Sequence, residues 1–210
     1  MATLPGVAAD PAAPGYTAFA ERLAGAEIRL SSLAAKPDRW GRAPAAAFLG
    51  DRPESLGEQI LEAGLARYLP DPAARPCRDR LLAAEAAARA AKRGLWAMPG
   101  AALDAGDARA ILAAPRGLAL VEGRILSIGE RRGRLYLNFG PRRTTDFTIV
   151  ISKRNLALFD AARIPVRELA GRRLRARGLV DRGFGPLMEI GTPDALEILD
   201  GGAQTADVKQ

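Results

Sequence analysis

Hydrophobic residues recur at two different spacings along the chain, and the spacing changes near Leu118. Before this point, apolar positions recur at the spacing of one face of an amphipathic helix. They predict three helices, over residues 16–23, 56–63 and 78–93. Beyond Leu118, apolar and polar residues alternate, which is typical of half-buried strands. The pattern therefore predicts a helix-rich first half and a strand-rich second half.

The second and third predicted helices carry start and stop signals. Ser55 and Glu58 have the spacing of a capping box, in which the two residues bond to each other's backbone N–H groups. Gly64 and Gly94 follow the two helices, and glycine readily adopts the left-handed backbone that commonly ends a helix.

Two short strands are predicted between the first and second helices. Ile28 and Leu30 alternate with charged residues, which indicates a half-buried strand. Residues 43–49 would form the return strand. Pro44 indicates that this strand lies at a sheet edge, because proline has no N–H to donate.

Segments without a clear period separate these elements. Residues 1–14 are rich in Pro, Ala and Gly and are predicted to be loose, and residues 70–76 to be a loop. Residues 99–114 are predicted to be a linker that holds one short helix, Asp107 to Ala113. The polar segment 201–210 is predicted to be a disordered tail.

The alternating half of the chain is predicted to form a small β-barrel. The predicted elements are strands 121–128, 134–139 and 146–151, a helix over 155–162, strands 172–180 and 186–190, and a last strand over 195–199. Three strands, a short helix and two strands follow one another in the chain order of an OB-fold.

Four short motifs lie in order between Lys36 and Trp96. They are Asp38-Arg39-Trp40-Gly41-Arg42, Gly57-Glu58-Gln59-Ile60-Leu61-Glu62-Ala63-Gly64-Leu65-Ala66, Ala84-Glu85-Ala86-Ala87-Ala88-Arg89 and Gly94-Leu95-Trp96. This ordered set resembles the second half of the thermonuclease (staphylococcal nuclease-like) family. There, an Asp-x-aromatic-Gly-Arg turn and two helices with such motifs follow at similar spacing.

The resemblance implies a truncated thermonuclease-like domain over residues 1–98, namely a partial OB barrel with three helices. The linker 99–114, a second OB-fold-like β-barrel over 115–200 and the tail 201–210 complete the predicted chain. The predicted fold class is therefore α+β, mainly β, with a partial staphylococcal nuclease-like barrel and a second small OB-like barrel.

The net charge of +7 is unevenly distributed. Residues 115–190 contain 16 Arg and Lys against 7 Asp and Glu, a net charge of +9, while the remaining residues carry −2. A positive second half would concentrate a polyanion such as nucleic acid.

The residue types present limit the chemistry. With one Cys, Cys77, and no His, the chain has no internal disulfide, no usual zinc ligand set and no His-activated nucleophile. No apolar run is long enough for a membrane span, and no signal peptide is evident at the start. The expected compartment is the cytoplasm as written, or outside it if a signal peptide precedes this sequence.

In the thermonuclease family two Asp residues hold calcium, a Glu positions or activates water, and two Arg residues neutralise the phosphate. The resemblance assigns one phosphate-binding role to Arg42. The segments that would supply the other groups are not recognisable, since one alignment places Ala8 and Ala9 in the metal-ligand region. Another alignment uses Asp10 but leaves no Glu after Pro11. We therefore expect no metal and no cofactor in this form, and Ca²⁺ only in a full-length active relative.

A basic face is predicted in the second half. Arg173, Arg175 and Arg177 alternate with small or apolar residues and would project from one side of a strand. Arg134 and Tyr136 would project from another strand. If these strands are neighbours, guanidinium groups and a stacking aromatic share one surface, as in single-strand binders. The alternative is a solvated Arg-rich face without a ligand.

Other singled-out residues have structural alternatives. Arg42 could be a plain turn residue that pairs with Asp38, and Glu85 a structural ion-pair partner. Trp40 and Trp96 are expected to serve packing.

Three functional classes stay open. The first is a thermonuclease-like protein associated with single-stranded DNA or RNA, catalytically inactive because the metal-ligand strands are missing. The second is a calcium-dependent phosphodiester endonuclease whose N-terminus is missing from the gene model. The third is a non-catalytic envelope or interaction module. A homo-oligomer that completes the first barrel is a further expectation.

Overall fold

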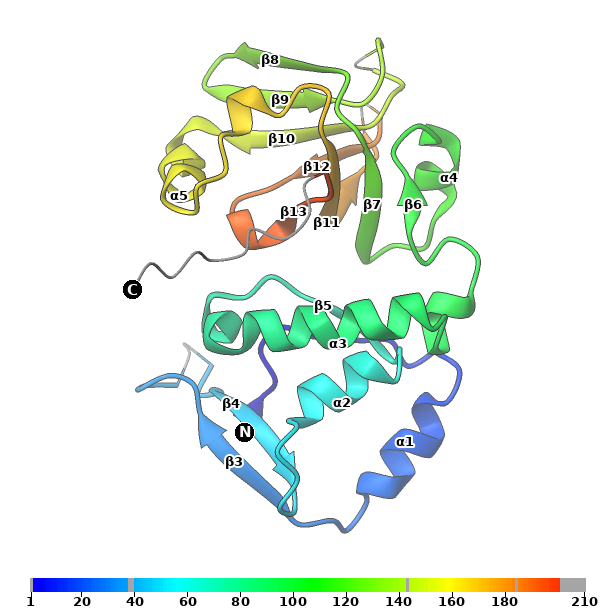
Figure 1. Ribbon diagram of the computed structural model, residues 1–210, viewed down its shortest axis with the longest axis vertical. Helices are drawn as coiled ribbons and strands as arrows, with labels where there is room; N and C mark the ends of the chain where they lie inside the picture. The colour runs from blue at the N-terminus through cyan, green and yellow to red at the C-terminus, as the bar shows by residue number, and fades with distance from the viewer. Residues whose placement is uncertain (1, 38–39, 143, 184, 201–210) are drawn as a thin grey trace, which may run out of the picture. The chain divides into compact units, whose positions relative to one another are not determined.

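The computed structural model describes residues 2–37, 40–142, 144–183 and 185–200. The chain forms two compact units, which divide after Ala101 (Figure 1). The expected turn residues Asp38 and Arg39 and the expected tail 201–210 lie outside the described residues.

The first unit contains the three predicted helices and more strands than the sequence indicates. Its α-helices are α1 (Tyr16–Leu23), α2 (Leu56–Glu62) and α3 (Arg78–Ala90). Its strands are β1 (Ala2–Thr3), β2 (Val7–Ala9), β3 (Ile28–Ser32), β4 (Ala43–Leu49) and β5 (Ala66–Tyr68). Two 3₁₀ helices, η1 (Pro72–Cys77) and η2 (Gly94–Ala97), lie on either side of α3 in the chain.

The capping box at the start of α2 is confirmed. The Ser55 N–H donates to Glu58 Oε2 at 2.9 Å, and the Glu58 N–H donates to Ser55 Oγ at 3.2 Å. The segment expected to be a loop before α3 is instead mostly the η1 helix. Asp71 caps it by accepting from the Ala73 N–H at 2.8 Å, and Pro72 suits its first position because no N–H is needed there.

The segment 1–14 was expected to be loose, but it supplies two strands. β1 pairs in parallel with β4, and β2 pairs antiparallel with β5. β4 is therefore the central strand of the order β1-β4-β3, and the edge position predicted from Pro44 is wrong. Pro44 is tolerated because it lies at the start of the strand, where its carbonyl accepts the Leu33 N–H at 2.9 Å.

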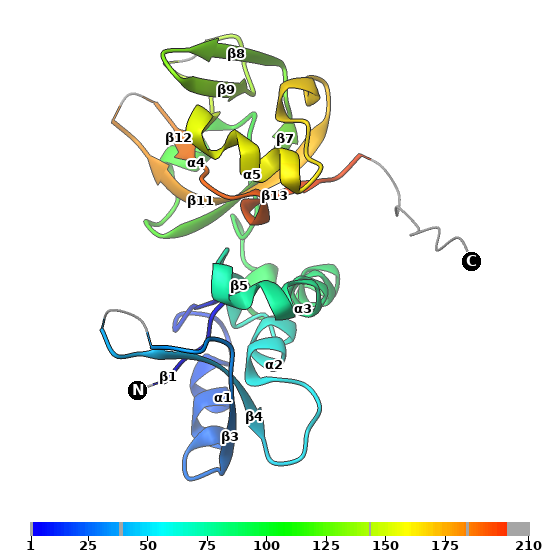
Figure 2. The same ribbon diagram turned by 90° about the vertical axis from the view of Figure 1, so that its left-hand side faces the viewer.

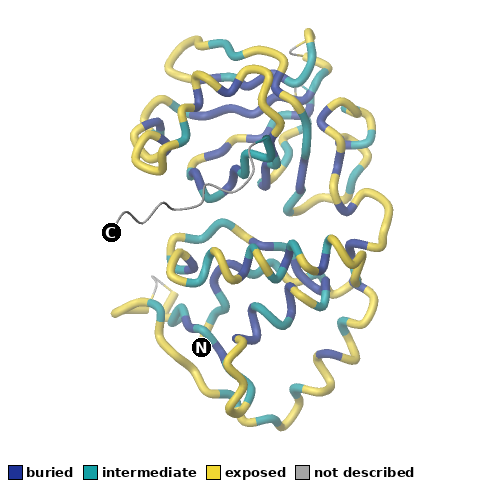
Figure 3. The backbone as a smooth tube through the Cα atoms, viewed as in Figure 1, coloured by how far each residue is buried: buried dark blue, intermediate teal, exposed yellow. Residues whose placement is uncertain are grey.

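The alternation of Ile28 and Leu30 predicted a half-buried strand, and β3 is found there. The strand is nevertheless mostly exposed, and the Leu30 residue retains 54% of its accessible surface (Figure 3). Burial of the strand depends on what packs over it, and α2 packs mainly against β4.

The core of the first unit lies where α2 and α3 pack against each other and against β5. Leu61, Tyr68, Leu81, Ala88 and Leu95 are almost fully buried there. Their removal from water is the main stabilising term for this unit.

Two glycines allow the chain to cross itself closely at this core. Gly64 ends α2 with φ 71°, and Gly94 follows α3 with φ 52°. The Leu95 N–H donates to the Gly64 carbonyl at 2.8 Å. A Cβ atom at Gly64 would lie 2.1 Å from the Arg93 carbonyl oxygen, so no larger residue fits.

The second unit is a curved, mainly antiparallel sheet with two α-helices. Its strands are β6 (Leu103–Asp104), β7 (Leu118–Arg124), β8 (Ser127–Arg131), β9 (Arg134–Asn138), β10 (Thr148–Ser152), β11 (Arg173–Asp181), β12 (Leu187–Glu189) and β13 (Leu196–Ile198). Its α-helices are α4 (Ala108–Ala113) and α5 (Leu156–Ala161), and its 3₁₀ turns are η3 (Lys153–Asn155), η4 (Val166–Glu168) and η5 (Pro193–Ala195).

The strand order confirms the OB-like arrangement. The order is β6-β7-β11-β12-β10-β9-β8, with β13 also paired to β11. β10 pairs with β12 and β6 pairs with β7 in parallel, whereas the other neighbouring strands on this path pair antiparallel. The path begins beside β7 and ends at β8, and β8 follows β7 in the chain after Ile125 and Leu126. This is the order of an OB-fold in which a bent first strand contributes to both ends of the sheet.

Two segments of this unit differ from prediction. The strand expected over 121–128 bends at Ile125 and is divided between β7 and β8. The expected linker contains the predicted short helix as α4, but it also contributes β6, and its Leu103, Ala105 and Ile111 side chains are buried in the core of the second unit. A linker pattern of Pro, Gly and Ala hid these apolar positions because they are too few to show a period.

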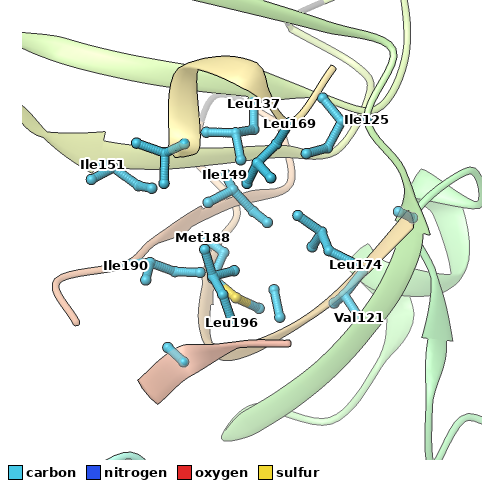
Figure 4. Packing of buried hydrophobic residues seen from close by; sticks show 14 of the residues in the cluster. Val121, Ile125, Leu137, Ile149, Ile151, Leu169, Leu174, Met188, Ile190 and Leu196 are labelled. Atoms are coloured by element: carbon cyan, nitrogen blue, oxygen red, sulfur yellow. The ribbon is translucent and has the colours of Figure 1, made fainter. Parts of the chain in front are cut away.

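The core of the second unit is formed by alternate residues of its strands. Val121, Leu137, Ile149, Leu174 and Met188 come from five strands and point toward one another (Figure 4). Side chains at these positions face inward, because successive residues of a strand point to opposite faces. The opposite faces of the same strands are therefore the ones that can carry ligand-binding groups.

We predict that Gly64→Ala destabilises the chain by about 2–4 kcal/mol, because its methyl group meets backbone that cannot move aside. Urea unfolding followed by circular dichroism measures the change. Gly25→Ala is the matched control, since Gly25 has φ 76° but no atom within 4 Å of its Cβ position. Gly25→Ala should lower the free energy of unfolding by about 1–2 kcal/mol, which is the cost of a positive φ for alanine without a steric clash. Equal losses for both variants would contradict the close approach.

Candidate nucleic-acid interface

Arg42 lies in the loop that leads into β4. Its guanidinium group lies over the Trp40 ring, 4.7 Å from the ring centroid. Trp40 is 63% exposed, so the packing role expected for it is not that of a core residue. The pair is a surface cation–π contact, which contributes about 0.5–1 kcal/mol in such a position.

The region where the resemblance would place metal ligands is held by other interactions. Ala8 and Ala9 lie on β2 and pair with Arg67 and Ala66 of β5. The Asp10 carboxylate lies 3.3 Å from the Arg67 guanidinium group. Within the described residues there is no group of three or more Asp, Glu, His or Cys side chains that could hold a metal ion.

Glu85 of α3 is a structural ion-pair partner, which was one interpretation of this residue from the sequence. Its side chain is fully buried and accepts the Tyr68 N–H of β5 at 2.8 Å and the Arg89 guanidinium group at 3.3 Å. Trp96 is also buried, with the Arg67 and Arg89 guanidinium groups each 5.7 Å from its ring centroid. These contacts join β5, α3 and η2.

The two predicted arginine strands are not neighbours. β9, with Arg134 and Tyr136, lies between β8 and β10, whereas the three arginines of β11 lie two strands beyond β10. The surface on which all five residues would lie together is therefore not formed. Alternation showed which side of its own strand each residue takes, but not which strands are adjacent.

The arginines of β11 do project from one side, but two of them are largely buried. The Arg175 and Arg177 side chains are 11% and 1% exposed, and the Arg173 side chain is 55% exposed. Arg175 lies 2.7 Å from Glu122 and 2.9 Å from Glu197, and Arg177 also contacts Glu197. Arg173 lies 3.7 Å from Glu122.

Strand register produces this network. Arg175 pairs directly with Glu122 on β7 and with Glu197 on β13, so opposite charges lie side by side on both edges of β11. Burial by itself lowers the pKa of Arg175, but Glu197 and Glu122 outweigh it and raise that pKa above its usual value. The positive charge of β11 is thus paired with carboxylates of the neighbouring strands β7 and β13.

Exposed positive charge gathers at the turn between β8 and β9. Arg131, Arg132 and Arg134 are exposed there, and none of the three forms an ion pair within the described part of the chain. We call these three residues the hairpin-tip patch. β8 and β9 lie side by side in both views of the second unit (Figures 1 and 2).

The turn fixes the geometry of the hairpin-tip patch. Arg132 has φ 49° and Gly133 has φ 74°, the two positive values that a tight two-residue hairpin turn requires. Arg131 and Arg134 then pair directly across the hairpin. Like charges opposite each other are unfavourable. The hairpin therefore holds repelling cations that a polyanion would neutralise.

Glu130, the acidic residue next to this patch, forms ion pairs with two cations outside the patch. It lies 2.5 Å from Lys153 Nζ and 3.3 Å from Arg167 Nε. The hydrogen bond from Lys153 lowers the pKa of the Glu130 carboxyl, slight burial opposes this, and Arg167 adds to the lowering. The carboxylate stays ionised with two cations and does not cancel the patch.

Tyr136 follows the patch along β9. It is half-buried and pairs across the sheet with Gly129 on β8 and Val150 on β10. Tyr136 and Arg134 are therefore the predicted site residues that the fold places together, whereas Arg131 and Arg132 were missed. Two consecutive arginines before a glycine, between two predicted strands, are the signal that could have identified them.

Comparison with known proteins finds a match for most of the first unit and none for the second. Residues 17–98 match the family model described as staphylococcal nuclease homologue, and this confirms the resemblance for that segment. The match ends before β6, so the hairpin-tip patch lies outside it. No curated protein matches the chain. Among the described residues, no helix is long and apolar enough to cross a membrane.

We predict that Glu197→Ala destabilises the chain by about 2–4 kcal/mol, because Arg175 and Arg177 lose this carboxylate in a largely buried position. Thermal or urea unfolding measures the loss. Glu189→Ala, at an exposed position of β12, is the control and should change the free energy of unfolding by about 0.5 kcal/mol or less. A neutral Glu197→Ala would show that the network contributes nothing to stability.

Proposed function

We propose that this chain, whose residues 17–98 form a staphylococcal nuclease-like segment, binds single-stranded nucleic acid through its second unit. The hairpin-tip patch and Tyr136 form the binding surface, and this form of the chain does not hydrolyse phosphodiester bonds.

The exposed, unneutralised charge of the hairpin-tip patch carries this proposal. Arg131, Arg132 and Arg134 can each donate paired hydrogen bonds to phosphate oxygens, for which the planar guanidinium group is suited. Phosphate binding there would also relieve the repulsion between Arg131 and Arg134. This relief adds to the direct attraction between the arginines and phosphate. Such contacts release counterions from the nucleic acid and make binding depend on salt.

Tyr136 makes single strands the favoured class of ligand. Arg134 and Tyr136 point to the same face of β9, because they are two residues apart. A strand whose backbone is held by the arginines can place an unpaired base near the tyrosine ring. Stacking on an aromatic ring tolerates any base, so we expect little sequence preference.

The proposal that this form is not a nuclease rests on what holds the candidate positions. Arg42 stacks on Trp40, Asp10 is paired with Arg67, and Ala8 and Ala9 have no ligand atoms in their side chains. A phosphodiester displacement at neutral pH needs a group or ion that activates water and one that stabilises developing charge. At these positions the Arg42 guanidinium group could supply the second function, and we propose that Ala8, Ala9 and the paired Asp10 do not supply the first.

We expect the double variant Arg131→Glu/Arg132→Glu to weaken binding of a fluorescent single-stranded oligonucleotide roughly tenfold or more at low salt, because four units of charge are changed. Fluorescence anisotropy across a salt series measures the affinity and its salt dependence. Arg109→Glu/Arg116→Glu is the charge-matched control at exposed positions outside the patch. Equal weakening by both pairs would indicate a diffuse charge effect and contradict the assigned surface.

Tyr136→Leu tests the stacking contact separately. Leucine keeps the apolar contact with the sheet but removes the ring, so we expect affinity to fall by about 1–3 kcal/mol with the salt dependence unchanged. Duplex binding should change less than single-strand binding. An unchanged single-strand affinity would exclude Tyr136 from the surface.

We expect the purified chain to leave single-stranded DNA and RNA intact in the presence of Ca²⁺. Gel electrophoresis of end-labelled oligonucleotides provides the measurement. Cleavage that depends on Ca²⁺ and disappears in Arg42→Ala would contradict the proposal and favour the endonuclease interpretation. Cleavage that persists in Arg42→Ala would indicate a contaminating nuclease.

A further inference from the structure

We propose that β3 is a dimerisation edge, at which two copies of the chain pair their β3 strands antiparallel about a two-fold axis at Leu30. The paired strands would join two three-stranded sheets into one continuous sheet of order β1-β4-β3-β3-β4-β1. This inference is independent of nucleic-acid binding, since it concerns the first unit alone.

One edge of β3 has no partner within the described residues, where β3 pairs with β4 alone. The Leu33 N–H donates to the Pro44 carbonyl across that pair. Alternate residues of an antiparallel strand point their backbone groups to the same side. Arg29 and Ser31 therefore bond toward β4, and the N–H and C=O groups of Ile28, Leu30 and Ser32 point to the open edge.

The apolar side chains of β3 extend the buried face of the sheet. Leu30 pairs with Ala47, and Ile28 pairs with Leu49, so these residues share one face. Ala47 is 3% exposed on that face, whereas Leu30 beside it is 54% exposed. The core face thus continues past the part of the sheet that α2 covers. A second β3 strand would place a second Leu30 beside the first and bury both.

The strand lacks the features that usually protect an edge. Charged residues, proline and bulges block pairing with another chain. β8 is another five-residue strand with one partner on the described path, and it carries Glu130 and Arg131. β3 carries one charged residue, Arg29, whose guanidinium group lies over the Phe48 ring at 4.6 Å.

A two-fold axis at Leu30 is the register that fits these features. It pairs all five residues: Leu30 with Leu30, Ile28 with Ser32, and Arg29 with Ser31. The outward-pointing backbone groups then face one another and bond. No like charges lie directly opposite, since Arg29 faces a serine. A shift that placed Arg29 opposite Arg29 would be unfavourable. The strand is therefore complementary to itself, and this favours a second copy over another partner.

Site-directed cross-linking tests the register in the full chain. In a Cys77→Ala background, Leu30→Cys should form an interchain disulfide under mild oxidation, because directly paired residues have Cα atoms about 5.5 Å apart. Ser32→Cys is the matched control on the same face of β3. Its two copies would lie more than about 12 Å apart and should not cross-link.

Association without cross-linking is measured by sedimentation velocity over a wide concentration range. We expect a monomer–dimer equilibrium whose dissociation constant rises roughly tenfold or more in Leu30→Lys, since two lysines would be directly opposite. Leu179→Lys is the control, because Leu179 is 70% exposed on a strand of the other unit. Circular dichroism checks that both variants are folded.

Dimers that weaken in Leu30→Lys but not in Leu179→Lys, together with cross-linking at Leu30→Cys alone, support the proposal. A chain that remains monomeric at every concentration overturns it. So does association that is unchanged in Leu30→Lys, because another surface would then be responsible. Equal cross-linking at Ser32→Cys and Leu30→Cys overturns the two-fold register.

Discussion

The pairing of Arg175 with Glu122 and Glu197 decides how the second unit presents its charge. These carboxylates flank β11 on two neighbouring strands, so the arginines that are most regularly spaced in the sequence are neutralised within the fold. Removing charges from water is costly, and the loss of one partner would leave the other charge largely buried without it. Exposed positive charge is held at the hairpin-tip patch, where a tight turn places Arg131 opposite Arg134.

The first unit depends on a different constraint, the close crossing of its chain at Gly64 and Gly94. The contact brings the ends of α2 and α3 together and lets Leu61, Leu95 and Trp96 become buried. The helical part of the staphylococcal nuclease-like segment is thus well packed, while β3 at the far edge of its sheet is not covered. Residues 17–98, which match the staphylococcal nuclease family model, include these helices together with β3 and β4.

The two proposals place function on edges and turns rather than in a pocket. An open strand edge offers backbone hydrogen bonds to a second copy, and a charged hairpin tip offers guanidinium groups to phosphate. Both are exposed for a physical reason: strands at an edge have one neighbour, and turns project beyond the sheet that orients them. The core of each unit supplies rigidity, and the exposed ends supply chemistry.

The sequence by itself determined the elements that local rules govern. These elements are the capping box at Ser55, the three helices of the first unit, and the succession of strands along the chain in the second unit. All of them depend on near neighbours in the sequence, and the structure confirms them. Tertiary structure decided which strands are adjacent. It made β4 central by pairing β1 with it, separated β9 from β11, and placed Glu122 and Glu197 beside Arg175. These outcomes depend on residues far apart in the chain, and a period of two along one strand does not specify its partners.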